Sequence, residues 1–140
     1  MKKILYSLCF ILLIIFNVNA EDTRAVKVDQ LVKTTSSWDG DLLPNYESEN
    51  PEITILKITI APGVQLPLHY HPVINAGVLI SGELTVTTED NEVLHLKAGE
   101  AIVEVVDKWH YGKNEGSVPA EIIVFYAGTP KIPITIKEED

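Results

Sequence analysis

Short runs of apolar and β-branched residues alternate with turn signals along most of the chain. Runs of this length, bounded by Gly, Pro, Asn or Asp, are typical of β-strands. Their regular spacing predicts an all-β fold, either a barrel or a sandwich. The runs expected to form strands are 53–60, 76–81, 84–88, 93–96, 101–106, 121–126 and 132–136.

The segment before the first of these runs carries a mixed pattern. Val26 and Val28 alternate as in a strand, although helical spacing is also present, and we interpret 25–33 as a strand. Residues 34–51 are rich in Ser, Asp, Asn and Pro and are expected to form a loop. Large apolar side chains in such a loop usually act as anchors, so four are expected to pack over the barrel: Trp38, Leu42, Leu43 and Tyr46.

The N-terminus has the pattern of a secretory signal peptide. Lys2 and Lys3 precede an apolar run over 4–16, and Val18-Asn19-Ala20 resembles a cleavage site. We therefore expect residues 1–20 to be removed and the protein to be periplasmic or secreted, with no membrane contact after cleavage. The alternative is an uncleaved membrane anchor, although the run is short for a spanning helix.

Composition narrows the function classes. Cys9 is the only cysteine and lies in the predicted signal peptide, so disulfides and thiol catalysis are excluded for the mature chain. The formal charge of −9 becomes −11 without Lys2 and Lys3, which makes nucleic acid an unfavourable partner. About 120 residues suit one domain. We divide them into an N-terminal strand and loop (21–50), a barrel (51–130), and a C-terminal strand with a charged, frayed tail (131–140).

Three histidines are the best candidates for chemistry. Alternate residues of a strand face the same side, so His69 and His71 project together while Tyr70 projects away. His110 follows 39 residues later, after enough strand-like sequence to cross back over a barrel wall. Closure of such a barrel would bring the three imidazoles onto one metal ion. His95 alternates with Leu94 and Leu96 and is expected to face solvent.

Two spaced patterns around these histidines resemble the signatures of the cupins. The first is Gly63-x5-His69-x-His71-x3-Asn75-x6-Gly82, in which Asn75 stands where the family usually has glutamate. The second is Gly99-x5-Val105-x-Asp107-x2-His110-x3-Asn114, in which Val105 and Asp107 replace the usual proline and glycine. The resemblance implies a single cupin barrel, that is, a jelly roll or double-stranded β-helix. It also implies one divalent metal ion (Fe, Mn, Zn, Ni or Cu) held by His69, His71 and His110.

The asparagine changes what such a centre would do. Asn75 lacks the negative charge of a carboxylate, so three neutral imidazoles would leave the ion its positive charge and favour a small anionic ligand. Asn75 itself has three open interpretations: direct ligation, a hydrogen bond to the bound ligand, or a merely polar residue of the strand. The alternative for the triad is a barrel without metal, in which the histidines are hydrogen-bonded interior residues.

Other residues near the second pattern are pocket candidates. Trp109 and Tyr111 flank His110 and are expected either to line the pocket or to pack against the N-terminal loop. Glu104 is the nearest acid that could replace the missing glutamate or act as a base, although a solvated position on the outer face is the simpler interpretation. Asn114 precedes Glu115-Gly116 and is expected to stabilise a turn.

Three function classes follow. The first is a metal-dependent enzyme acting on a small, anionic molecule, with dioxygenase-like oxidation as the reaction that three-histidine relatives suggest. The second is a module that binds a small ligand without turnover, which the lack of an obvious general base favours. The third is an assembly role, because outward apolar positions such as Ala76, Val78 and Ile80 could pair two copies unless Trp38 and Leu42 cover them.

Overall fold

The computed structural model describes residues 27–46 and 50–138. The predicted signal peptide, residues 1–20, lies outside the described residues. Within those ranges the ordered elements are all β-strands, as the alternation pattern predicts. The described residues form no helix long and apolar enough to span a membrane.

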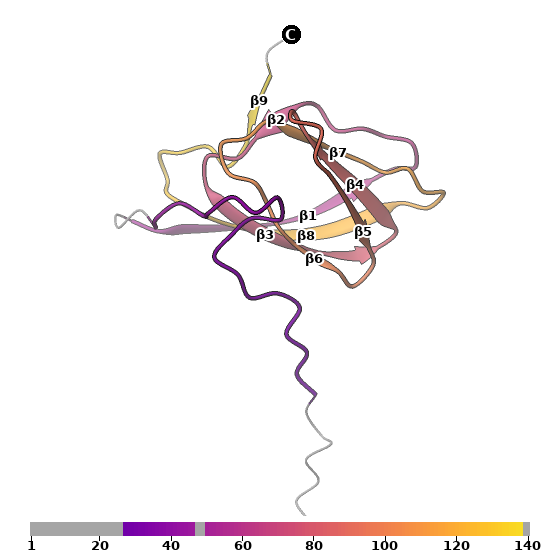
Figure 1. Cartoon of the computed structure of the whole chain (residues 1–140), viewed down its shortest axis with the longest axis horizontal. Helices are drawn as coiled ribbons and strands as arrows, with labels where there is room; N and C mark the ends of the chain where they lie inside the picture. The colour runs from indigo at the N-terminus through magenta and orange to yellow at the C-terminus, as the bar shows by residue number, and fades with distance from the viewer. Residues whose placement is uncertain (1–26, 47–49, 139–140) are drawn as a thin grey trace, which may run out of the picture.

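The strands form two antiparallel sheets that face each other across a barrel interior (Figure 1). One sheet has the order β1-β8-β3-β6 and the other has the order β5-β4-β7-β2-β9. Neighbours in each sheet are mostly distant in sequence, as in a jelly roll. The strands are β1 Glu52–Ile60, β2 His69–Tyr70, β3 Ile74–Ser81, β4 Glu83–Thr88, β5 Val93–Lys97, β6 Ala101–Val103, β7 His110–Lys113, β8 Ala120–Gly128 and β9 Ile136–Lys137.

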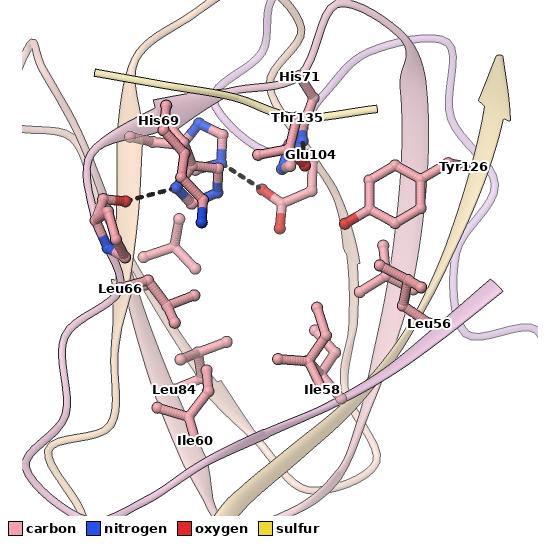
Figure 2. Close-up of a pocket in the computed structure, with 17 residues that line it drawn as sticks. Leu56, Ile58, Ile60, Leu66, His69, His71, Leu84, Glu104, Tyr126 and Thr135 are labelled. Atoms are coloured by element: carbon pink, nitrogen blue, oxygen red, sulfur yellow. Dashed lines mark hydrogen bonds and ion pairs between the residues drawn. The ribbon is translucent and has the colours of Figure 1, made fainter. Parts of the chain in front are cut away.

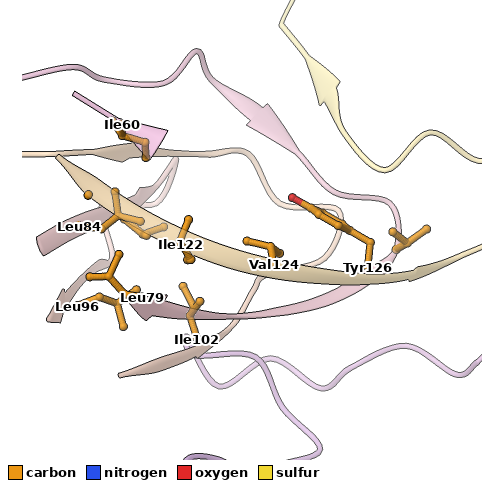
Figure 3. Packing of buried hydrophobic residues seen from close by; sticks show 11 residues of the cluster. Ile60, Leu79, Leu84, Leu96, Ile102, Ile122, Val124 and Tyr126 are labelled. Carbon is orange, nitrogen blue, oxygen red and sulfur yellow. The ribbon is translucent and has the colours of Figure 1, made fainter. Parts of the chain in front are cut away.

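The core forms because inward and outward positions alternate along the central strands. In β3, β4 and β8 every second residue is buried. Leu79 and Ile102 of the first sheet are almost fully buried, and Leu84 and Leu96 of the second sheet belong to the same cluster (Figure 3). Burial of one such side chain contributes about 2 kcal/mol, so this cluster is what holds the two sheets together.

Two tight corners depend on left-handed backbone. Gly82 connects β3 to β4 with φ of 74°, and an added Cβ there would lie 2.6 Å from the carbonyl oxygen of Pro119. Only glycine fits this corner. Asp107, which stands where the family pattern has glycine, also adopts a positive φ of 56°, and its amide donates to the His71 carbonyl. Aspartate tolerates this conformation better than most residues, so the substitution keeps the turn.

The N-terminal loop is fixed to the barrel by fewer side chains than expected. Trp38 packs against the core, and its amide donates to the Val103 carbonyl. Lys108 binds the loop by ion pairs with Asp39 and with Asp41. Leu42 and Tyr46, by contrast, are about four-fifths exposed, so their expected role as anchors is wrong.

Several predicted boundaries also need correction. Residues 27–33 of the predicted strand 25–33 do not form a strand, because no neighbouring strand pairs with them. Val28 is 84% exposed, so it does not contribute to the core. Within 132–136 only the last residue is in a strand, and the run predicted over 101–106 ends at Val103. Lys137, expected in a frayed tail, pairs with His69 in β9.

Candidate metal centre

The barrel brings the three histidines together at one end of its interior (Figure 2). His69 of β2 is directly opposite His110 of β7 in the antiparallel pairing, and His71 follows β2 on the same side as His69. One ring nitrogen from each lies within 4.8 Å of the others. The predicted convergence of the three imidazoles is therefore confirmed.

Backbone carbonyls fix which nitrogen each ring presents. The Nδ1 atoms of His69, His71 and His110 lie 2.7, 2.8 and 2.9 Å from the carbonyl oxygens of Pro67, Ile134 and Lys108 respectively. A carbonyl oxygen only accepts, so each Nδ1 carries the hydrogen and each Nε2 keeps a lone pair. This is the arrangement in which a protein orients histidines as metal ligands.

Burial keeps the imidazoles neutral. Removal from water lowers the pKa of His71 to about 3 and that of His110 to about 4, and it also lowers the pKa of His69. The hydrogen bonds to backbone carbonyls oppose these shifts but do not overcome them. At neutral pH the centre therefore offers uncharged nitrogen lone pairs, which are the form that binds a metal.

Glu104 lies inside the barrel, which corrects the interpretation of a solvated outer-face residue. The residue is only 8% exposed, and its Oε2 atom lies 3.8 Å from Nε2 of His110 without a hydrogen-bond donor. Burial raises the pKa of Glu104 to about 7. Ile102 is opposite the buried Gly77, and Glu104 follows two residues later, so the alternation of β6 gives Glu104 the inward face.

Asn75 is also buried beside this region. The amide of Glu104 donates to the Asn75 carbonyl, so the two residues are neighbours on adjacent strands. The Asn75 side chain is 1% exposed, and its Oδ1 atom has no hydrogen-bond partner. Its Nδ2 atom makes one long contact of 3.5 Å to the Val73 carbonyl. These contacts leave both ligation and a hydrogen-bonding role open to Asn75.

Trp109 and Tyr111 are not among the residues that line the cavity, so the first of the two alternatives for them, a pocket wall, is not observed. They flank His110 in sequence, and because His110 points inward they point the other way. Trp109 packs instead against the outward ring of Tyr70, with ring centroids 4.7 Å apart. His95 is exposed as predicted, and Asn114 is fully buried in a turn as predicted.

The histidines and Glu104 open onto a cavity of about 350 Å³. Most of the residues that line this cavity were not predicted from the sequence. The alternation of apolar residues in β1, β4 and β8 could have identified them, because it shows which side chains face the barrel interior. Burial and the nearby Glu104 raise the pKa of Tyr126, which lines this cavity, to about 12. The other lining residues are Leu56, Ile58, Ile60, Leu66, Pro67, Leu84, Val86, Gly112, Ile122, Val124, Thr135 and Lys137.

These donors fit a divalent transition metal. Neutral imidazoles suit zinc, copper, iron and nickel, and a carboxylate adds a hard oxygen that manganese and iron also accept. One ring nitrogen of each histidine lies within 4.8 Å of the others, and the unpartnered Oε2 atom of Glu104 lies 3.8 Å from Nε2 of His110. A cation that draws these acceptors together would satisfy them all.

Comparison with known proteins agrees with this fold. The sequence profile of the Cupin domain matches residues 56–126. No curated protein sequence matches the chain significantly. An uncharacterized conserved protein with a double-stranded β-helix domain from Klebsiella pneumoniae is 22% identical, with a TM-score of 0.52 over 69% of this chain and 90% of that one.

Two enzymes of known structure are also similar in fold. A DMSP lyase from Ruegeria pomeroyi is 16% identical, with a TM-score of 0.54, over 63% of this chain and 45% of the lyase. Oxalate decarboxylase from Bacillus subtilis is 22% identical, with a TM-score of 0.53, over 61% of this chain and 23% of the decarboxylase. The chain thus spans less than half of either enzyme, and at these identities the likeness shows the fold alone.

Proposed function

The chain belongs to the cupin family, and from this premise we propose that it is a metal-dependent enzyme acting on a small, anionic molecule at the three-histidine centre. Its export, with a mature chain starting at Glu21, is part of the same proposal and is supported by the pattern of residues 1–20. The one observation that carries the proposal is the convergence of three Nε2 lone pairs, each oriented by a backbone carbonyl.

The residues of the chain supply most of what such an enzyme needs. His69, His71 and His110 would hold the ion, which when bound would act as a Lewis acid or, if redox-active, take part in oxidation. Three neutral ligands leave the ion's charge largely uncompensated, and Lys137 at the cavity adds a further positive charge. Both features favour an anionic substrate. Glu104 is the buried carboxylate in reach of the centre, suited to bind the ion or to accept a proton.

Replacement of Glu104 by glutamine tests its role. We expect the affinity for Mn²⁺ to fall by about tenfold to a hundredfold, because the variant keeps the shape of the side chain but removes its charge. Isothermal titration calorimetry measures the change. Glu89→Gln removes an exposed acid after β4 and serves as the control. Equal affinities in the two variants would show that Glu104 takes no part in metal binding.

Turnover separates the enzyme from a binding module. Metal analysis of the purified protein, followed by oxygen uptake against diketones, thiols and hydroxylated aromatics, tests a dioxygenase reaction. We expect stoichiometric divalent metal and oxygen consumption with one of these classes. A loaded centre without turnover would favour the second candidate, a non-catalytic module that binds a small ligand. A protein that takes up no divalent ion after reconstitution would contradict both metal-dependent versions.

We further propose that two copies associate through the outer face of the sheet β1-β8-β3-β6. Ile55, Phe125 and Ala76 are directly opposite one another across three adjacent strands, and Ile55 and Phe125 are about half exposed. Leu42 is 81% exposed, so it does not cover this face. Contiguous apolar side chains on an exposed sheet face favour association with another protein surface.

A charge in the centre of this face tests the association. Phe125→Glu is expected to convert a dimer into a monomer in analytical ultracentrifugation, because two carboxylates would be buried against apolar side chains. Tyr111→Glu, on the other sheet, is the control and should leave the dimer intact. A wild-type protein that sediments as a monomer at micromolar concentration would contradict the proposal.

A further inference from the structure

The cavity beside the histidines has two chemically different parts. Its polar part holds the three imidazoles, Glu104 and Lys137, whereas the remainder is lined almost entirely by aliphatic side chains. Apolar walls would leave the polar groups of a small, fully polar anion without hydrogen-bond partners, so a site for such an anion would have few of them. The aliphatic part therefore carries information about the ligand.

The aliphatic walls come from both sheets. On β1, Leu56, Ile58 and Ile60 alternate with outward residues and project together into the cavity (Figure 2). Leu84 faces them from the second sheet, and Leu66 approaches from the segment before β2. The walls thus surround the space below the histidines, and a ligand there would be in contact with aliphatic carbon on several sides.

The size of the space limits the ligand. An apolar cavity of roughly 150 Å³ accommodates benzene, and this cavity has a volume of about 350 Å³. It therefore accommodates a molecule of roughly eight to twelve non-hydrogen atoms once a polar head group is included.

The charge of the polar part determines which end of such a molecule lies there. Lys137 is opposite His69 in the β2–β9 pairing and lines the cavity, so the two side chains share one side of the sheet. Together with a bound divalent ion it outweighs the single carboxylate of Glu104. A negatively charged head group would be attracted to this end, and the walls below it would take an apolar body.

We propose that the ligand of this cavity is an amphipathic acid, with a carboxylate or similar chelating head at the histidines and an apolar body of about seven carbons against the aliphatic walls. The position of the head rests on the proposed function, whereas the position of the body rests on the cavity alone. This ligand class is narrower than the small anionic molecule inferred from the centre itself.

A series of straight-chain carboxylates, from acetate to dodecanoate, tests the inference on the purified protein. Calorimetric affinity is expected to rise about fourfold for each methylene group up to octanoate, because each group leaves water for an aliphatic surface. Beyond that length the affinity should stop rising. Binding that does not depend on chain length, or no binding of any acid, would overturn the proposal.

Two cavity variants are expected to move the preferred length in opposite directions. Gly112→Val would fill part of the space, since a Cβ at Gly112 lies 3.4 Å from a Leu84 methyl and 3.5 Å from a Leu66 methyl, at ordinary contact distances. It should shift the preference to shorter acids. Ile58→Ala would enlarge the space and should shift it to longer acids. A damaged fold would weaken binding at every length and would not move the preference.

Thr59→Ala, on the exposed side of β1, is the matched control and should leave the preferred length unchanged. An unaltered preference in both cavity variants would place the acids outside the cavity and overturn the inference.

Comparison of Zn²⁺-loaded with EDTA-treated protein separates this inference from the proposed function. Should the metal proposal fail, zinc would not strengthen acetate binding, yet the gain with chain length would persist in EDTA-treated protein. Should the inference fail, zinc would strengthen the binding of the acids, but their affinity would not rise with chain length in either form of the protein.

Discussion

Replacement of His110 by alanine is expected to lower the affinity for Zn²⁺ by roughly two to three orders of magnitude. The free energy of binding at structural zinc sites with four ligands is about 10–16 kcal/mol, so the loss of one ligand removes about a quarter of it. His110 is 2% exposed, and its ring is oriented by the Lys108 carbonyl. Because β7 is paired with strands on both sides, the position of this ring is fixed by the barrel.

Calorimetry and thermal unfolding measure this loss independently. Ligand present at a thousand times its dissociation constant stabilises a protein by about 4 kcal/mol, so zinc should raise the melting temperature of the wild type much more than that of the variant. His95→Ala is the matched control, because His95 is exposed on β5 and lies outside the triad. Unchanged zinc affinity in the His110 variant would refute the metal centre.

Replacement of Asn114 by alanine is expected to lower the free energy of unfolding by about 3 kcal/mol, while zinc affinity changes little. The Asn114 Nδ2 atom donates to the carbonyls of Ile60 and Val118, and its Oδ1 atom accepts from the amide of Gly116. The side chain is fully buried, so alanine would leave these backbone groups without partners and without water. Each such group costs about 1–3 kcal/mol.

Urea denaturation measures the stability, and calorimetry measures the zinc affinity of the same variant. Asn45→Ala, in the exposed N-terminal loop, is the control and should change stability by less than about 0.5 kcal/mol. If the Asn114 variant were as stable as the wild type, the turn would not depend on these hydrogen bonds. If it lost zinc affinity as strongly as the His110 variant, the separation of structural from metal-binding roles would be wrong.

Local sequence patterns were enough to predict the features that depend only on residues close together in the chain, such as strands and tight turns. The period-two alternation of 53–60 and of 84–88 is enough to specify a strand, and His69 and His71 share a face by the same rule. The corner at Gly82 follows because only glycine tolerates that backbone next to Pro119. The family pattern added His110, which spacing alone does not connect to the other two.

Features that depend on tertiary pairing were not predicted. Val28 has the residue type of a strand, but no partner strand lies beside it among the described residues. Glu104 shares the inward face of Ile102 two residues earlier, but a charged residue is usually solvated, and only the packing of the barrel shows that this carboxylate is buried. Trp109 was assigned to the pocket by proximity to His110, although neighbours on a strand point to opposite sides.

Residues near the C-terminal end of the described chain contact the histidine centre directly. The Ile134 carbonyl orients the ring of His71, Lys137 pairs with His69, and the amide of Glu138 donates to the Leu68 carbonyl. A polyhistidine tag joined after Asp140 would therefore start within a few residues of the ligands and could compete with them for the ion. Purification for metal analysis should rely on a cleavable tag elsewhere, or apparent metal stoichiometry will measure the tag.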